Sequence, residues 1–253
     1  MVVTGSGGSG SGRAIASRFA REGSFVVVSD INRDGGLETV QEIEREGGRA
    51  IFYFADVRIE EQVFALLEFA HLTNGAVRVL VNNASAAYRP GESLEHWTEI
   101  VQTDLFGAMY GTRFAIDFMR QAGGGSIINV SSTSALGHGR ASPGGSPAYD
   151  IAKAGILRLT TTLAGLASEG IRVNCIAPDW IATPELKAYV DSLSPDERIR
   201  GGVPSRLTTL DEISSAVLQL ATDEALTGRV LVWWSDDVPR LIPWGDPGYA
   251  SLS

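Results

Sequence analysis

Short apolar runs rich in β-branched residues alternate along this chain with longer stretches in which apolar positions recur at helical spacing. The short runs contain few polar positions, as strands do when both faces of a parallel sheet are covered. The predicted strands are Val2 to Thr4, Phe25 to Ser29, Ala50 to Phe54, Val77 to Val81, Ser126 to Val130, Arg172 to Ile176 and Val230 to Trp234. The predicted helices are Arg13 to Arg21, Leu37 to Arg45, Glu60 to Ala70, Trp97 to Arg120, Ala148 to Ala167 and Leu210 to Thr222. This alternation predicts an α/β fold, a doubly wound domain in which helices cover both faces of a seven-stranded parallel sheet.

Composition narrows the class of protein without naming a function. The chain has 253 residues and 44% hydrophobic composition, and no repeat or low-complexity linker divides it, so we expect a single domain over residues 1–253. A formal charge of −9 argues against a nucleic-acid partner, which needs a basic surface. No stretch of about 18 apolar residues occurs, and the start lacks a charged region followed by an apolar one. We therefore expect neither a membrane span nor a signal peptide.

Potential metal ligands and thiols are few. Cys175 is the single cysteine, and His71, His96 and His138 are scattered along the chain. This pattern predicts no disulfide framework and no metal site. A chain with one cysteine in an apolar run fits a reducing compartment, so we expect a cytoplasmic protein.

A glycine-rich loop follows the first predicted strand and precedes the first predicted helix. Its sequence is Gly5-Ser-Gly7-Gly8-Ser-Gly10-Ser-Gly12. Glycines let the backbone come close to a pyrophosphate, while free N–H groups at the start of the next helix point at its charge. The spacing alone also fits a flexible linker, but its place between a strand and a helix favours a dinucleotide site.

Asp30 ends the second predicted strand, 20 residues after Gly10. A carboxylate there accepts hydrogen bonds from the hydroxyls of the adenosine ribose and repels a 2′-phosphate. This predicts NAD as the cofactor, with NADP less favoured. The alternative is that Asp30 only opens the turn Asp-Ile-Asn-Arg.

Tyr149 and Lys153 stand four residues apart in a predicted helix, a spacing that puts both side chains on one face. A free tyrosine has a pKa of about 10, and an ammonium about 4 Å away contributes roughly 4 kcal/mol at an effective dielectric of about 20. That energy corresponds to about three pKa units, so Lys153 is expected to make Tyr149 an acid and base near neutral pH. Ser132 is our choice for the hydroxyl that holds the substrate oxygen. Ser131 and Ser134 are rivals, and each serine alone also fits a turn or a helix cap.

Together these motifs resemble the short-chain dehydrogenase/reductase family, in its classical subgroup, over nearly the whole chain to about Val232. The resemblance rests on motifs in family order: Thr4-Gly5 with Gly10-Ser11-Gly12, Asp56-Val57, Asn82-Asn83-Ala84, Tyr149-x-x-x-Lys153, and Pro178-Asp-Trp180-Ile181-Ala-Thr183. It implies a Rossmann-like fold and an oxidoreductase that interconverts a secondary alcohol and a ketone with NAD.

The resemblance also assigns roles to residues. It implies Ser132, Tyr149, Lys153 and Asp104 as the catalytic set, with Lys153 also binding the nicotinamide ribose. It implies cofactor contacts from the glycine loop, the adenine segment and the nicotinamide segment, namely Gly5, Gly7, Ser9, Gly10, Ser11, Gly12, Asp30, Ile31, Asp56, Val57, Asn83, Ala84, Ser85, Tyr149, Lys153, Pro178, Ile181 and Thr183. Candidate substrate contacts are Ser134, His138, Trp180 and Leu186.

The expected partners are a small alcohol or ketone and further copies of the chain. In the family, the helices from Glu99 to Arg120 and from Ala148 to Ala167 form the subunit interface, which implies a homodimer or homotetramer. Residues 182–205 are expected to form a substrate lid whose apolar positions suit an apolar or mixed substrate. Residues 235–253 form a C-terminal tail, and the sequence leaves open whether this tail enters the active site of its own chain or covers a neighbouring subunit.

Several positions depart from the family pattern. Asp104 stands where the family has the asparagine of its proton relay, Ser85 replaces the glycine after Asn-Asn-Ala, and Asp179 replaces the glycine after Pro178. The loop from Ser132 to Tyr149 is several residues longer than the family pattern, and the cofactor loop has one extra residue. These changes leave open a second interpretation, an NAD-binding sensor or interaction protein with degraded catalysis. A third, a lyase, epimerase or dehalogenase, is less favoured, because the family's dehalogenases lack the cofactor motif and carry arginine at the lysine position.

Overall fold

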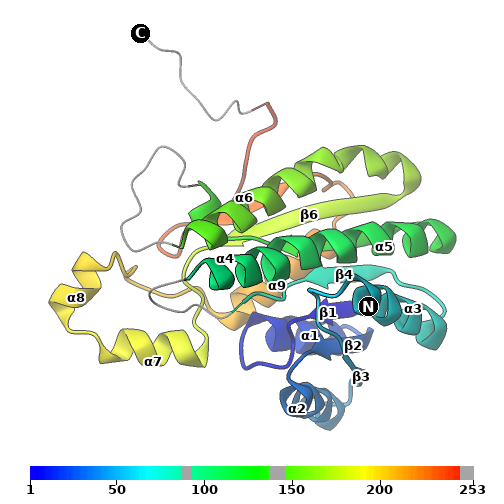
Figure 1. The fold of residues 1–253 in the computed structure, drawn as a ribbon, viewed down its shortest axis with the longest axis horizontal. Coiled ribbons are helices and arrows are strands. Elements are labelled where there is room, and N and C mark those ends of the chain that lie inside the picture. Colours follow the sequence, from blue (N-terminus) through cyan, green and yellow to red (C-terminus); the bar gives the residue numbers. More distant parts are fainter. Residues whose placement is uncertain (87–92, 137–145, 246–253) are drawn as a thin grey trace.

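Eight strands form one sheet in the computed structural model, which describes residues 1–86, 93–136 and 146–245 (Figure 1). The strand order is β3-β2-β1-β4-β5-β6-β7-β8. The strands are β1 (Val2–Thr4), β2 (Phe25–Asp30), β3 (Arg49–Phe54), β4 (Val79–Asn82), β5 (Gly125–Val130), β6 (Ile171–Pro178), β7 (Val230–Trp233) and β8 (Arg240–Leu241). The first seven are parallel, as predicted, and each lies within two residues of its predicted ends at both termini.

The expectation of seven strands missed β8, which pairs antiparallel with the outer edge of β7. Its register sets Leu241 opposite Leu231 and Arg240 opposite Val232, and the Ile242 N–H donates to the Val230 carbonyl at 3.0 Å. A strand of two residues is too short to show an alternating pattern, and prolines on both sides of it predict irregular structure.

Alternating residues of β1, β2 and β5 enter two separate cores on opposite faces of the sheet. Val3, Val28 and Ile128 pack with one set of helices, whereas their neighbours Val2, Val27 and Ile127 pack with the other. Because all six are buried, the strands are apolar on both faces, which is why the sequence shows short apolar runs.

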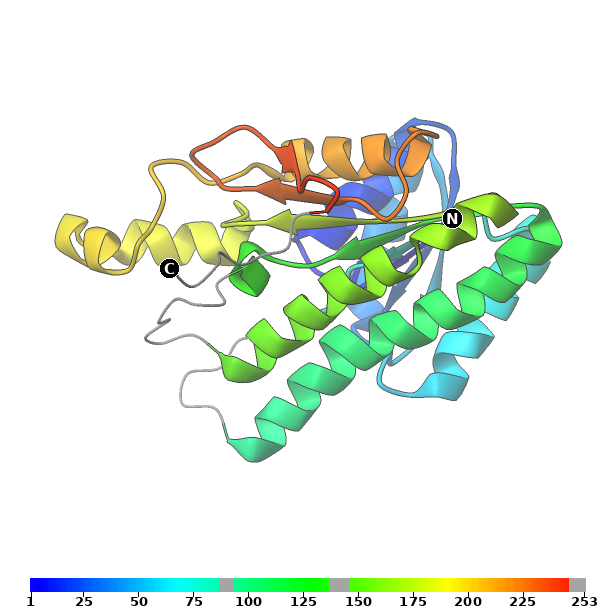
Figure 2. The same ribbon diagram turned by 90° about the horizontal axis from the view of Figure 1, so that it is seen from above.

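Helices cover both faces of the sheet, and Figure 2 shows α1 and α9 on the opposite side from α5 and α6. The first face carries α1 (Ser11–Arg21), α2 (Arg33–Arg45) and α9 (Leu210–Thr222). The second carries α3 (Glu60–Asn74), α4 (Leu94–Ile100), α5 (Gly107–Ala122) and α6 (Pro147–Thr162). The bounds of α9 match the prediction, since Thr209 and Glu212 form a reciprocal cap that fixes its start.

Two predicted helices are subdivided in the structure. The segment predicted as one helix from Trp97 to Arg120 consists of α4, the π-helical turn η1 (Val101–Phe106) and α5. The segment predicted from Ala148 to Ala167 consists of α6 and the 3₁₀ turn η3 (Ala164–Glu169). Apolar periodicity does not distinguish a 3₁₀ or π-helical turn from an α-helix. The sequence pattern therefore predicted one continuous helix for each segment.

Helices α7 (Pro184–Ser192) and α8 (Pro195–Arg200) extend away from the body of the domain in both views. They occupy the segment predicted as a lid. A short 3₁₀ turn, η2 (Thr133–Leu136), follows β5. Across the described ranges, no helix combines the length and apolar composition needed to cross a membrane.

Candidate active site

The glycine-rich loop folds tightly between β1 and α1. Gly5 has a φ of 65°, and a Cβ atom there would lie 2.6 Å from the Ala84 Cα atom. A Cβ atom on Gly12 would lie 2.1 Å from the Gly5 carbonyl oxygen. Asn83 fixes this geometry, because its amide donates to the Thr4 and Gly5 carbonyls at 3.0 Å each and its carbonyl accepts from the Ser11 hydroxyl at 2.7 Å. Residues from the predicted loop and from the end of β4 thus meet.

The first turn of α1 is open at its N-terminus. Gly10 is the N-cap residue and provides no side-chain hydrogen bond to the helix. The backbone N–H groups of this turn are therefore free to bind an anion, which the helix dipole also favours.

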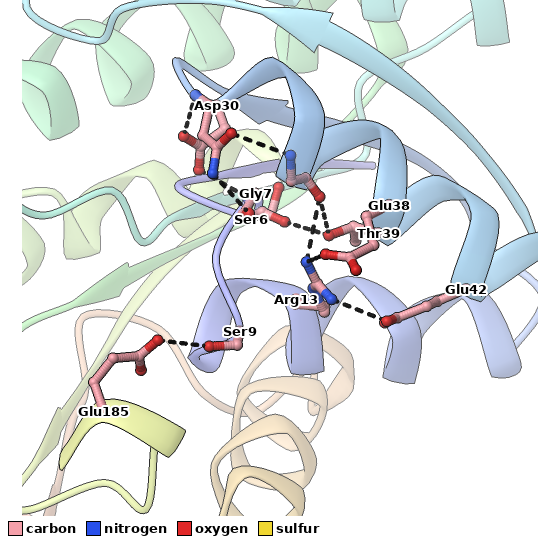
Figure 3. Close-up of polar contacts among 11 residues, drawn as sticks. Ser6, Gly7, Ser9, Arg13, Asp30, Glu38, Thr39, Glu42 and Glu185 are labelled. Atoms are coloured by element: carbon pink, nitrogen blue, oxygen red, sulfur yellow. Dashed lines mark hydrogen bonds and ion pairs between the residues drawn. The ribbon is translucent and has the colours of Figure 1, made fainter. Parts of the chain in front are cut away.

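Asp30 lies at the end of β2 against the glycine loop (Figure 3). One carboxylate oxygen accepts from the Gly7 N–H at 2.7 Å, and the other accepts from the Asn32 N–H at 2.8 Å. Gly7 must be small here, since a Cβ atom on it would lie 2.9 Å from the Asp30 side chain. The carboxylate therefore braces the turn and borders a cavity at the same time.

That cavity has a volume of about 360 Å³ at the carboxyl ends of the strands. It brings together many of the predicted cofactor contacts, namely Gly5, Asp30, Ile31, Asp56, Val57, Ala84 and Ser85. The sequence did not predict that Arg58 and Glu99 would also line it.

Asp56 forms an ion pair with Arg58 that the sequence did not predict. The Arg58 guanidinium donates to both carboxylate oxygens of Asp56, at 2.9 Å and 2.6 Å, and lies 3.4 Å from Glu99. These hydrogen bonds hold the pKa of Asp56 below its usual value, against the opposing effect of partial burial. A spacing of two residues in a turn carries little sequence signal for such a pair.

Helices α1 and α2 are joined beside the glycine loop by Arg13. Its guanidinium pairs with Glu38 at 2.7 Å and with Glu42 at 2.9 Å (Figure 3). Thr39, also on α2, donates its hydroxyl to the Ser6 carbonyl at 2.8 Å. The charge of Arg13 is thus already matched by two carboxylates within the protein.

The loop also contacts the predicted lid. The Ser9 hydroxyl donates to the Glu185 carboxylate in the first turn of α7 at 2.8 Å. Thr183 caps α7 by accepting from the Leu186 N–H at 3.2 Å. A Cβ atom on Gly10 would lie 3.5 Å from the Thr183 methyl group, so the predicted nicotinamide segment does lie next to the predicted phosphate loop.

Tyr149 and Lys153 lie on α6, close to its start. Ser146 caps this helix by accepting from the Tyr149 N–H at 3.2 Å, and Pro147 occupies its first turn. The Lys153 Nζ atom lies 5.2 Å from the centroid of the Tyr149 ring. The predicted pair therefore shares one face of the helix.

Lys153 is a buried ammonium with two acceptors among the described residues. Its Nζ lies 3.0 Å from the Asp104 carboxylate and donates to the Val130 carbonyl at 3.2 Å. Burial lowers the pKa of Lys153, but the facing groups together, with Asp104 first among them, outweigh burial, and the pKa lies above the ordinary value. The π-helical turn η1 places Asp104 there, in a type of turn that is frequent at functional sites.

The three candidate serines have different surroundings. The Ser131 hydroxyl is buried and donates to the Lys153 backbone carbonyl at 2.8 Å, so it supports α6. The Ser132 oxygen accepts from the Ser134 N–H at 3.2 Å, which leaves its proton available to donate. The Ser134 oxygen is buried and has no partner within the described residues.

Asp179 connects three segments near the end of β6. Its carboxylate accepts from the Thr133 hydroxyl at 3.2 Å and from the Ser235 N–H at 3.4 Å. Pro178 ends β6, Trp180 is half-buried, and Ile181 forms an isolated bridge with Thr208. The candidate His138 lies outside the described residues.

Three comparisons with known proteins bear on this site. A family model described as "Enoyl-(Acyl carrier protein) reductase" matches residues 6–233. The chain is 34% identical over 239 residues to a cis-4-hydroxycyclohexanecarboxylate dehydrogenase of Sinomonas cyclohexanicum, covering 91% of this chain and 92% of that protein. It is 36% identical over 238 residues to a 3-oxoacyl-[acyl-carrier-protein] reductase of Chlamydia trachomatis, covering 91% and 93%.

A solved structure agrees with these similarities. A 7α-hydroxysteroid dehydrogenase complexed with NADH and 7-oxo glycochenodeoxycholic acid superimposes with a TM-score of 0.81 at 30% identity. The match covers 93% of this chain and 92% of that one.

Proposed function

This chain belongs to the short-chain dehydrogenase/reductase family and is an oxidoreductase acting on CH–OH groups, and on that premise we propose that it interconverts a secondary alcohol and a ketone with NAD. The observation that carries the proposal is the buried Lys153 ammonium, 5.2 Å from the Tyr149 ring. Ser85 and Ala86 line the cavity beside Asp30 and also contact Asp104, which pairs with Lys153. The acid/base pair is thus connected to this cavity through Asp104.

The residues around the cavity fit a nicotinamide dinucleotide. Gly5 and Gly12 leave space that a Cβ atom would fill, and the open first turn of α1 supplies N–H donors for a pyrophosphate. The Asp30 carboxylate would accept from ribose hydroxyls. When bound, the nicotinamide exchanges hydride with the substrate carbon, and the protein supplies orientation and proton transfer.

In the proposed reaction, Tyr149 accepts the hydroxyl proton during oxidation and returns a proton to the substrate oxygen during reduction. Lys153 supports the phenolate form by its charge and has an N–H group left to bind the nicotinamide ribose. Ser132 donates its hydroxyl to the substrate oxygen, since that proton is available and the Ser131 hydroxyl is used by α6. Half-buried Trp180 and Leu186 border the substrate from the nicotinamide segment and α7.

A preference for NAD over NADP is supported by the charges beside the glycine loop. The Asp30 carboxylate stands at the cavity and would repel a 2′-phosphate. Arg13, the nearest guanidinium in the loop helix, is already paired with Glu38 and Glu42. Arg33 lies over aromatic rings of β3 at 6.0 Å, outside the residues that line the cavity.

We place this activity in a cytoplasmic homodimer or homotetramer. Cys175 is a buried free thiol, and burial raises its pKa to about 12, which suits a reduced and unreactive cysteine. Phe106, Met109 and Ile151 are large apolar residues that remain 41%, 43% and 62% exposed on η1, α5 and α6. Exposed apolar side chains on adjacent helices support a subunit interface there.

The test combines cofactor binding with turnover. Calorimetric titrations with NAD and NADP, on wild type and Tyr149→Phe, measure the two affinities, and a panel of secondary alcohols is then screened by the absorbance of the reduced cofactor. We expect NAD to bind both proteins more tightly than NADP. Turnover should fall by about 10²-fold or more in Tyr149→Phe, because the variant keeps the ring but lacks the acidic proton.

Two outcomes would contradict the proposal. Tight NAD binding by wild type without turnover across a broad panel would favour the sensor interpretation. Absence of binding by either nucleotide would remove the cofactor assignment itself.

A further inference from the structure

Two departures from the family pattern contact each other in this structure. The Ser85 hydroxyl, at a position where the family has glycine, donates to the Asp104 carboxylate at 2.5 Å. Asp104 itself stands where the family has asparagine. The Ala86 N–H donates to the second oxygen of the carboxylate at 2.8 Å. The segment after β4 and the π-helical turn η1 are therefore joined through this one side chain.

The carboxylate is surrounded by donors. Ser85, Ala86 and Lys153 direct an O–H, an N–H and an ammonium at its two oxygens, and the Asp104 side chain is buried. Two carboxylate oxygens accept all three, whereas an asparagine amide would have one oxygen and would turn an NH₂ group toward some of these donors. The surroundings of position 104 are thus matched to an ionised aspartate in a charge-assisted network.

We propose that Asp104 is a positioning residue that acts through Lys153, fixing the ammonium and offsetting its charge, so that proton transfer by Tyr149 operates at higher pH than it would with the family's asparagine. This inference rests on the proposed dehydrogenase function. It follows from distance: Asp104 lies 3.0 Å from the ammonium, while the Tyr149 ring centroid lies at 5.2 Å. A carboxylate so close cancels much of the positive potential that reaches the phenol.

The charged and titratable groups that face Lys153 come from three elements. Asp104 faces it from η1, Tyr149 from its own helix α6, and Cys175 from β6, with the Val130 carbonyl of β5 as a further acceptor. Burial raises the pKa of Cys175 to about 12, so the thiol is neutral over the working range of pH. Within the described residues, Asp104 is thus the carboxylate that balances this ammonium.

The decisive experiment is the pH dependence of kcat/KM for wild type, Asp104→Asn and Ser85→Gly. In Asp104→Asn, we expect the acid limb of the profile to move to lower pH by about one unit or more, because the ammonium is no longer offset. In Ser85→Gly, the carboxylate charge is kept and one hydrogen bond is lost. We expect that variant to be slower while its acid limb stays within about 0.3 units of wild type.

An unmoved or alkaline-shifted acid limb in Asp104→Asn would overturn the proposal. So would a uniform loss of rate at every pH, since that result belongs to a merely structural side chain. If Asp104→Asn does not fold, the double variant Ser85→Gly/Asp104→Asn, which carries the family's residues at both positions, takes its place with the same expected shift.

Thermal unfolding against pH separates this inference from the proposed function, because it needs no substrate. The pKa of Lys153 is raised in the folded protein, so its stabilisation is fully present below the ordinary lysine value and is lost as pH rises through the higher folded value. In Asp104→Asn, the buried ammonium is unpaired, so Tm should be lower than in wild type at neutral pH and should rise as pH increases. If wild type turns over no alcohol, the proposed function fails while this Tm comparison still tests the ion pair. Parallel Tm curves for the two proteins would contradict the pairing.

Discussion

At the scale of single residues, the Asp30 carboxylate both stabilises a turn and lines a cavity. Its carboxylate accepts from Gly7 and Asn32, which holds the loop and the start of α2, and it also borders the cavity of about 360 Å³. The two interpretations offered by the sequence, a turn residue and a ribose ligand, are therefore compatible. The two N–H donors also fix the position of the carboxylate at the edge of the cavity.

Replacement of Asp30 is expected to change the choice of cofactor. In Asp30→Ser, NAD should bind about tenfold or more weakly and NADP more tightly, because the ribose acceptor is weakened and the repulsive charge is removed. Calorimetric titration with both nucleotides measures the ratio of the two dissociation constants. Asp34→Ser is the matched control, since Asp34 is an exposed carboxylate on α2 that does not line this cavity. An equal change of the ratio in both variants would show a general charge effect only.

Some residues of the candidate site could be predicted from the sequence, and others could not. The spacing of Tyr149 and Lys153 on one helix fixed their relation, because helical geometry is local. The choice among Ser131, Ser132 and Ser134 stayed open, since it depends on which hydroxyl the backbone of α6 accepts. The pairing of Arg58 with Asp56 was missed for a similar reason: in a turn, side-chain direction is set by the backbone path and not by spacing.

At the scale of elements, the site is assembled where β1, β4 and the first turn of α1 converge. Close approach of the backbone, more than any side chain, shapes the glycine loop. The predicted loop, strand and helix were identified by their order, but the sequence did not show which glycines are sterically required. The structure separates them, because a Cβ atom on Gly12 would meet the Gly5 carbonyl at 2.1 Å, whereas one on Gly8 has its nearest neighbour at 4.0 Å.

This difference predicts that alanine is tolerated at one glycine of the loop and destabilising at another. Gly12→Ala should lower the free energy of unfolding by about 1–3 kcal/mol and Tm by about 5 °C, and NAD affinity should fall at least about tenfold. Gly8→Ala should leave Tm and NAD affinity close to wild type. Differential scanning calorimetry and nucleotide titration on both variants test this. Similar losses in the two would show that loop flexibility, and not steric fit, is what the glycines provide.

At the scale of the whole molecule, the C-terminal segment of the chain adds the last strand to the sheet, β8. β8 occupies the outer edge of β7, and Trp244 beyond it stacks with Arg229 at 5.2 Å. The apolar runs in the sequence predict the first seven strands, which have three to eight residues each, whereas a two-residue edge strand leaves no comparable pattern. The sequence left open whether the tail lies on its own chain or on a neighbouring subunit, and residues 240–242 pair with β7 of their own chain.

Removal of this edge strand is expected to destabilise the protein. A chain ending at Asp237 loses the β7–β8 hydrogen bonds and the stacking of Trp244, so Tm should fall by about 5 °C or more. The exposed edge of β7 should also promote aggregation, which light scattering measures. A chain ending at Gly245 keeps β8 and is the control. Equal effects of the two truncations would place the stabilising contacts after residue 245.

The order of strands has a consequence for how the protein is made. From β4 to β8, each new strand pairs with the one synthesised just before it, so the sheet grows outward in the direction of translation. The exception is β1, which pairs with β2 on one side and must wait for β4 on the other. Until β4 leaves the ribosome, the glycine loop lacks Asn83, the side chain that fixes it. The nascent chain therefore fixes the glycine loop only after Asn83 has been translated, and β8 covers the edge of β7 later still.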